Sequence, residues 1–128
     1  MGTTIEMKGS TGQDDLRSDC HAVLRVFLKG NPNPIVFDPI FGYQKENTPF
    51  DVPVDIGDVR NATDINSFQL EHVSVENFGS TRDNWNLNYV EFWFKSAGNF
   101  PQLIAGYGNH RFTGDSPVID IPVGSMPP

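Results

Sequence analysis

Hydrophobic and polar residues alternate along several short segments of the chain, and this period of two predicts β-strands. The segment 21–28, HAVLRVFL, alternates most regularly, with Leu24 and Val26 on one face and Arg25 on the other. No segment sustains the period of an amphipathic helix. The pattern therefore indicates an all-β chain.

Twelve glycines and ten prolines divide the chain into short runs, as turns between strands require. About eight strands at this spacing predict an antiparallel eight-stranded β-sandwich. Pro53 places its strand at a sheet edge, because proline cannot donate a hydrogen bond to a neighbouring strand. The alternation slips near His72, which predicts a β-bulge there, and DPIFGY (38–43) is expected to be a loop. Strands are expected at 3–8, 21–28, 35–37, 50–56, 64–78, 87–95, 102–107, 110–114 and 117–123.

The length of 128 residues is that of one domain, with residues 1–2 and 124–128 expected to fray. The first ten residues lack the apolar core of a signal peptide, and no run approaches the roughly 18 apolar residues of a membrane span. We therefore expect a soluble chain. Cys20 is the single cysteine, so an internal disulfide is impossible.

The formal net charge of −7 argues against nucleic acid as a partner, since phosphate binding needs a basic surface. The three histidines are scattered without the spacing of a zinc site. No serine lies in a Gly-x-Ser-x-Gly elbow, and no nucleophile is placed beside a base. The sequence thus predicts a protein that is not an enzyme.

Oxygen-bearing side chains are concentrated in two segments, TGQDDLRSD (11–19) and STRDNWNLNY (80–89). Calcium takes six to eight oxygen ligands from carboxylates, amides and backbone carbonyls, so such segments are candidate ligand sources. The alternative is that these residues form ordinary turns and bond their own backbone, or pair with Arg17 or Arg82. Each segment leads into a strong strand, and whether the two segments meet depends on which ends those strands start from.

Four aromatic residues lie in predicted loops, where they are candidates for contact with a ligand or membrane. At a membrane interface aromatic rings are favoured, and on a sugar-binding surface they stack on pyranose rings. For the tryptophan, the alternative is that its ring closes the end of the core. The four residues are Phe41, Tyr43, Phe78 and Trp85.

The stretch WNLNYVEFWF (85–94), together with TGQDD (11–15) before a strand, resembles the PLAT domain, the lipoxygenase-homology relative of C2 domains. The resemblance covers roughly residues 3–95. It departs from the family in the doubled DDLR, in the DPIFGY insertion and in the tail beyond residue 95. It implies an eight-stranded antiparallel sandwich whose two loops meet at one end and, as in several family members, bind calcium. The implied ligands are Asp14, Asp15, Asp83, Asn84 and Asn86.

These observations together predict a non-enzymatic calcium-binding module that attaches to a membrane or lipid surface, or to a protein partner, through its loops. The alternative is a lectin-like module, in which the same ion or the aromatic residues hold a carbohydrate.

Overall fold

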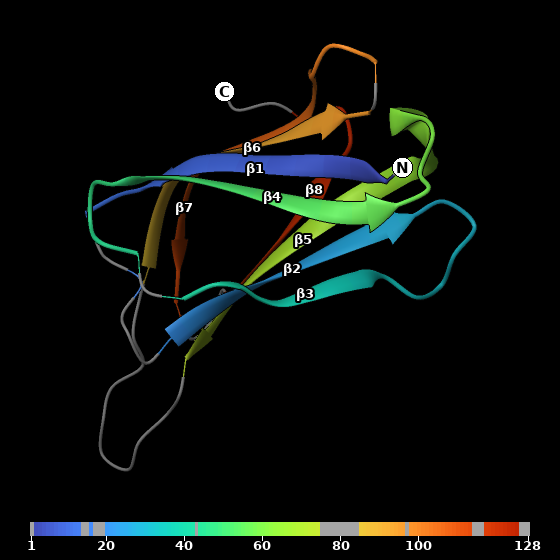
Figure 1. Cartoon of the computed structure of the whole chain (residues 1–128). Coiled ribbons are helices and arrows are strands. Elements are labelled where there is room, and N and C mark those ends of the chain that lie inside the picture. The colour runs from blue at the N-terminus through green and yellow to red at the C-terminus, as the bar shows by residue number, and fades with distance from the viewer. Residues whose placement is uncertain are drawn as a thin grey trace.

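Eight strands within the described part of the chain form two four-stranded antiparallel sheets, which pack face to face as a sandwich (Figure 1). The predicted fold class is therefore confirmed. The computed structural model describes residues 2–13, 16, 20–42, 44–74, 85–96, 98–113 and 117–125. The elements are β1 (Thr3–Thr11), β2 (Cys20–Leu28), β3 (Ile35–Phe41), β4 (Pro49–Gly57), the 3-10 helix η1 (Ala62–Asp64), β5 (Ile65–Ser74), β6 (Trp85–Lys95), β7 (Gln102–Phe112) and β8 (Val118–Pro122).

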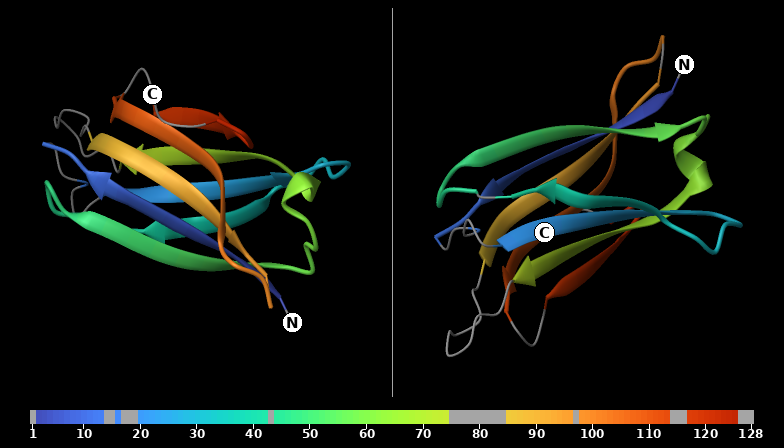
Figure 2. Two further views of the ribbon diagram at one scale, coloured as in Figure 1. Left: turned by 90° about the horizontal axis from the view of Figure 1, so that it is seen from above. Right: turned by 60° about the horizontal axis from the view of Figure 1, so that its bottom comes forward.

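The strand order is β4-β1-β6-β7 in the first sheet and β3-β2-β5-β8 in the second (Figure 2). β4 lies at a sheet edge, as Pro53 predicts. Because every neighbouring pair is antiparallel, β1, β3, β5 and β7 finish at the same end of the sandwich where β2, β4, β6 and β8 begin. We call this end the crossover end, since the four connections there pass between the sheets. The opposite end, with the β2–β3, β4–β5 and β6–β7 connections, is the hairpin end.

The core lies between the sheets and is filled by the inward residues of each alternating strand. In β1 these are Ile5 and Met7, both fully buried, while their outward neighbours are only partly buried. The rings of Phe68 on β5 and Phe92 on β6 stack with centroids 4.0 Å apart and planes 5° from parallel. This stack joins the central strands of the two sheets, and the burial of such rings is a main source of stability in a sandwich.

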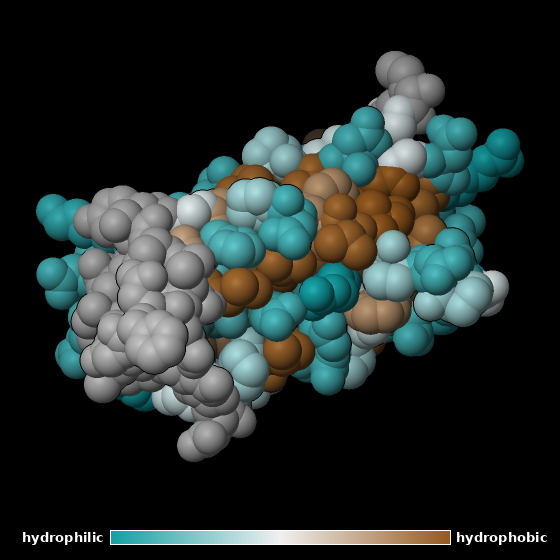
Figure 3. All heavy atoms as spheres, turned by 90° about the horizontal axis from the view of Figure 1, so that it is seen from below, coloured by the Kyte–Doolittle hydropathy of each residue, from teal (hydrophilic) through white to brown (hydrophobic). Residues whose placement is uncertain are grey.

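The outer face of the second sheet combines apolar and polar side chains (Figure 3). Val36 on β3 is 50% exposed there, whereas Val23 on β2 is buried. Beside them, Arg25 Nη1 lies 2.9 Å from Glu71 Oε1 and donates to Gln69 Oε1 at 3.1 Å. Gln69 Nε2 in turn donates to an Asp120 carboxylate oxygen at 2.9 Å, so a polar chain connects β2, β5 and β8.

The predicted bulge near His72 is wrong. Pairing between β5 and β2 is regular from Ser67 to Ser74, and the register shift lies between Phe27 and Leu28 instead. His72 is 5% exposed and continues the inward positions of β5. The alternation of hydrophobic residues is interrupted near His72 because this polar residue occupies an inward position, where the pattern leads us to expect an apolar side chain.

Two further segments differ from the expected strands. β3 continues through residues 38–41, which were predicted to be a loop, and contains a cis Asp38–Pro39 peptide bond. β7 is one strand from Gln102 to Phe112 rather than two, because Gly106 and Gly108 pair with β6 without interruption. After β8, Gly124 N donates to Ile104 O at 2.8 Å, which ties the chain at that point to β7.

Candidate functional site

The strand ends that flank the two oxygen-rich segments meet at the crossover end. Gly12, directly after β1, donates its N–H to the carbonyl oxygen of Asn86 on β6 at 2.8 Å. A Cβ atom on Gly12 would lie 2.8 Å from Asn88 Oδ1, so a larger residue at this position would require the exposed Asn88 side chain to move. β1 therefore ends and β6 begins at the same end of the sandwich, a relation that the sequence left open.

A third segment joins these strand ends. Asn47 N donates to Gly12 O at 2.9 Å, and Thr11 N donates to Thr48 O at 2.9 Å. Leu16 and Gln44 exchange two backbone hydrogen bonds of 2.9 Å. Leu16 is also fully buried, so this residue is held by both backbone bonding and apolar burial.

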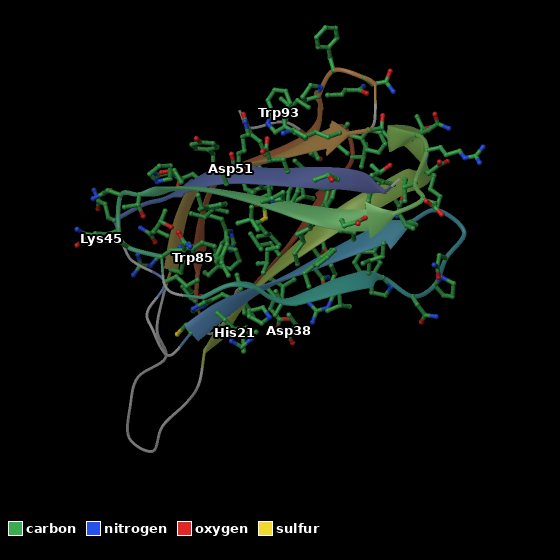
Figure 4. All side chains as sticks on the ribbon, viewed as in Figure 1. His21, Asp38, Lys45, Asp51, Trp85 and Trp93 are labelled. Atoms are coloured by element: carbon green, nitrogen blue, oxygen red, sulfur yellow. The ribbon has the colours of Figure 1, made fainter. Side chains whose placement is uncertain are left out.

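Trp85 closes the core at this end instead of lying in a loop (Figure 4). It is the first residue of β6 and is 0% exposed. Its ring stacks on Phe112 with centroids 4.9 Å apart and meets Phe41 edge-on at 5.7 Å. The expectation that Trp85 contacts a membrane or sugar is therefore wrong, and the alternative that it closes the core is the correct one.

Phe41 is likewise not a loop residue. It ends β3, is half-buried, and packs against Phe50 with centroids 4.9 Å apart. Its ring belongs to the aromatic cluster around Trp85, which also includes His72 at 6.3 Å from the indole. The sequence did not identify His72 as part of this cluster, because an isolated histidine gives no signal of an inward position.

Asn86 lies beside Gly12, but its side chain already has a partner. Its Oδ1 accepts a hydrogen bond from Arg111 Nη1 on β7 at 2.8 Å. A guanidinium at this distance disfavours a second cation at the same oxygen. The remaining predicted residues lie outside the described part of the chain: Asp14, Asp15, Tyr43, Phe78, Asp83 and Asn84.

Among the described residues, no three His, Cys, Asp or Glu side chains are close enough together to hold a metal ion. The described strands thus provide the frame of the crossover end.

A second cluster, which the sequence did not predict, lies on the outer face of the first sheet, where Asp51 and Trp93 are found (Figure 4). Glu6 Oε1 is 2.9 Å from Lys95 Nζ and 3.2 Å from Lys8 Nζ. The Lys8 ammonium lies 5.7 Å from the centroid of the Trp93 ring, within reach of a cation–π interaction. Charged groups therefore connect β1 and β6 across this face.

The pKa values of the two carboxyl groups in this cluster shift in opposite directions. The hydrogen bond from Lys95 lowers the pKa of Glu6, and Lys8 lowers it further. Although Asp51 is exposed, partial desolvation beside the sheet raises its pKa, and the charge of Glu6 adds to this rise. The lysines thus favour the charged form of Glu6, while Asp51 is disfavoured as a second anion.

Comparison with known proteins finds similarity in structure only. No family model matches the sequence, and no curated protein matches it. Crystal structures of an engineered deletion variant of a lipoxygenase are similar in fold. One, with an additional substitution, has a TM-score of 0.61 and 15% sequence identity, and the match covers 97% of this chain. Another, in complex with arachidonate, has a TM-score of 0.59 and 15% identity over 94% of this chain.

The chain has the PLAT fold. It spans 17% of the length of the first of these lipoxygenase chains, and the matched part is their non-catalytic β-sandwich. Identity this low establishes the architecture of a PLAT domain and nothing finer. Among the described residues of this PLAT fold, none forms a helix with the length and apolar character needed to cross a lipid bilayer.

The hydrogen bond between Trp85 and Thr11 gives a test of how the crossover end is held. Trp85 Nε1 donates to Thr11 Oγ1 at 3.3 Å, and both residues are fully buried. Thr11→Val keeps the side-chain volume but leaves the indole N–H without an acceptor. We expect the free energy of unfolding in urea to fall by about 1–3 kcal/mol. Thr11→Ser, which keeps the hydroxyl, should lose clearly less, and equal stability of Thr11→Val and the wild type would contradict the assignment.

The ion pairs of Glu6 predict a dependence of stability on pH. Because Lys95 lowers the folded-state pKa of Glu6, its contribution is present above the unfolded pKa and is lost as pH falls through the folded pKa. Lys95→Gln should therefore lower the unfolding free energy at pH 7 by about 0.2–1 kcal/mol at low salt.

The difference between Lys95→Gln and the wild type should shrink as the pH falls through the folded-state pKa of Glu6, because protonation removes the charge that Lys95 pairs with. Denaturant titrations at pH 7 and in acid measure it. Lys29→Gln makes the same change in net charge at an exposed hairpin position and serves as the control. A loss that persists unchanged in acid, or that Lys29→Gln reproduces, would contradict the account.

Proposed function

We propose that the chain is a non-catalytic attachment module that binds calcium at its crossover end and contacts a lipid surface or protein partner through the loops there. The observation that carries the proposal is the hydrogen bond between Gly12 and Asn86, 2.8 Å long. Through it, the strands that lead to both oxygen-rich segments are held side by side. A hard divalent ion needs oxygens from more than one such segment to complete six to eight ligands.

We assign the ligands to Asp14, Asp15, Asp83 and Asn84, and we leave out Asn86 because Arg111 holds its amide oxygen. The donor set is carboxylate and amide oxygen, which suits calcium rather than zinc or copper. Two carboxylates 4 Å apart repel each other by about 1 kcal/mol at a dielectric constant of 80 and by about 4 kcal/mol at 20. A bound ion relieves this repulsion and thereby stabilises the folded domain.

Calcium also changes the sign of the local charge. The chain carries a formal net charge of −7, and anionic lipid would repel it without a cation. An ion with two positive charges between the acidic segments supplies the attraction that the protein itself lacks. Since Trp85 and Phe41 belong to the core, we assign apolar contact at this end to Phe78 and Tyr43.

Calcium should raise the thermal stability of the domain. At about a hundredfold excess over the dissociation constant, mass action adds about 2.7 kcal/mol to the free energy of unfolding. The melting midpoint followed by circular dichroism should therefore rise with calcium relative to chelator, and Asp83→Asn should abolish most of this rise.

The matched control for Asp83→Asn is Asp58→Asn, which removes the same charge from an exposed position at the hairpin end. It should leave the calcium-induced rise intact. A midpoint that ignores calcium, or an equal loss of the response in both variants, would contradict the calcium site.

Attachment to lipid is tested by sedimentation with vesicles of phosphatidylcholine and phosphatidylserine. The protein should sediment with the vesicles in calcium and stay in the supernatant in chelator. Phe78→Ser should reduce binding, because the ring would no longer enter the interface. Phe100→Ser, at a residue that is 93% exposed at the hairpin end, should bind as the wild type does.

Sedimentation that is indifferent to calcium would contradict the proposed mechanism. If calcium raises the melting midpoint but the protein does not sediment with vesicles, the calcium site stands, and the loops are assigned to a protein partner instead of lipid.

A further inference from the structure

A polar hollow lies at the hairpin end of the sandwich, and none of its lining residues belongs to the crossover end. In Figure 1 the start of the chain, the β4–β5 connection and the β6–β7 hairpin all lie toward this end. They enclose a hollow of about 480 Å³. A second hollow of about 330 Å³ shares Arg60, Ser96 and Asn99 with the first and extends to Phe100. Together they have the size of a site for a small molecule.

The charged groups of the hollow have no hydrogen-bond or ion-pair partner among the residues that the structure describes. Arg60 and Asp58 both line it, and both are exposed. Neither side chain forms an ion pair or hydrogen bond within the part of the chain that the structure describes. A guanidinium offers five donors and a carboxylate only acceptors, so the pair presents complementary groups to one ligand.

The neutral lining of the hollow is ordered by internal hydrogen bonds. Asn99 Nδ2 donates to Ser96 Oγ at 2.9 Å, which orients the amide across the β6–β7 hairpin. On the other side, the Thr3 hydroxyl donates to the carbonyl oxygen of Val59 and ties β1 to the β4–β5 connection. Thr3 is 5% exposed, so this wall is part of the folded body of the domain.

An aromatic ring stands at the edge of the hollow. Phe100 is 93% exposed, far more than any other large hydrophobic residue among those described. Leaving such a ring in water forgoes roughly 1.5–3 kcal/mol of burial, and Phe100 is not among the described hydrophobic residues that pack against the core. An exposed ring beside amide, guanidinium and carboxylate groups combines an apolar platform with paired hydrogen-bonding groups.

We propose that this hollow binds a neutral oligosaccharide built from hexoses. The flat apolar face of a pyranose ring stacks on Phe100, while adjacent hydroxyls, each a donor and an acceptor, pair with Arg60, Asp58 and the Asn99 amide. The lining holds one positive and one negative side chain, so the hollow is close to neutral. The net charge of −7 repels a polyanion, and a single carboxylate is too few for a calcium site.

The test uses the whole chain in chelator, so that the calcium site plays no part. Isotope-labelled protein is titrated with neutral oligosaccharides of glucose, galactose and mannose, and with oligosaccharides of uronic acids. With at least one neutral series, amide resonances of residues 58–61, 96–100 and 102 should shift, and the resonances at the crossover end should not. Phe100→Ala should weaken binding about tenfold, equivalent to roughly 1.4 kcal/mol, and Arg60→Gln should weaken it as well.

Phe100→Ala should fold normally, because the ring is already exposed. The matched control is Tyr89→Ala, which removes a 39% exposed ring from the outer face of the first sheet. The proposal is overturned if no neutral series shifts these resonances at millimolar concentration, or if only uronic acids do. It is also overturned if Tyr89→Ala weakens binding as much as Phe100→Ala.

Discussion

The buried indole of Trp85 is the contact on which the crossover end depends. Its ring stacks on Phe112 of the same sheet and meets Phe41 of the opposite sheet, so it fills the gap where the two sheets would otherwise part. Its N–H is satisfied by Thr11, the last residue of β1. A single side chain thus joins both sheets and the strand that leads into the first oxygen-rich segment. The end of β1 is thereby held beside the start of β6.

The two ends of the sandwich have different chemistry because the topology separates them. Four connections cross between the sheets at one end, and the acidic residues 14, 15 and 83 of the sequence lie in two of them. The other end is closed by two hairpins and by η1, and its hollow is polar but balanced in charge. The stacked rings of Phe68 and Phe92 lie in the core between the two sheets.

The sequence predicted the sandwich because alternation of period two is a direct consequence of one buried face on each strand. The prediction failed where a residue lies in an environment that is unusual for its type. His72 occupies an inward position, so the pattern suggested a bulge that is absent. Pro39 suggested a loop, yet its cis peptide bond lies within β3.

The sequence could not predict contacts between segments that lie far apart along the chain. The pairing of Arg111 with Asn86 joins residues that no motif relates, and it removes one candidate ligand. The hollow at the hairpin end is assembled from three segments, represented by Thr3, Arg60 and Asn99. None of these residues stands out alone, and only the fold brings them together.

The central claim is that the crossover end holds one ion between two segments that are far apart in sequence. Titration calorimetry of calcium binding to Asp14→Asn, Asp83→Asn and the double variant tests it as a double-mutant cycle. If both carboxylates bind the same ion, their effects on the binding free energy should be non-additive by about 0.5–3 kcal/mol. Effects that add within about 0.3–0.5 kcal/mol, or a wild-type protein that binds no calcium, would contradict it.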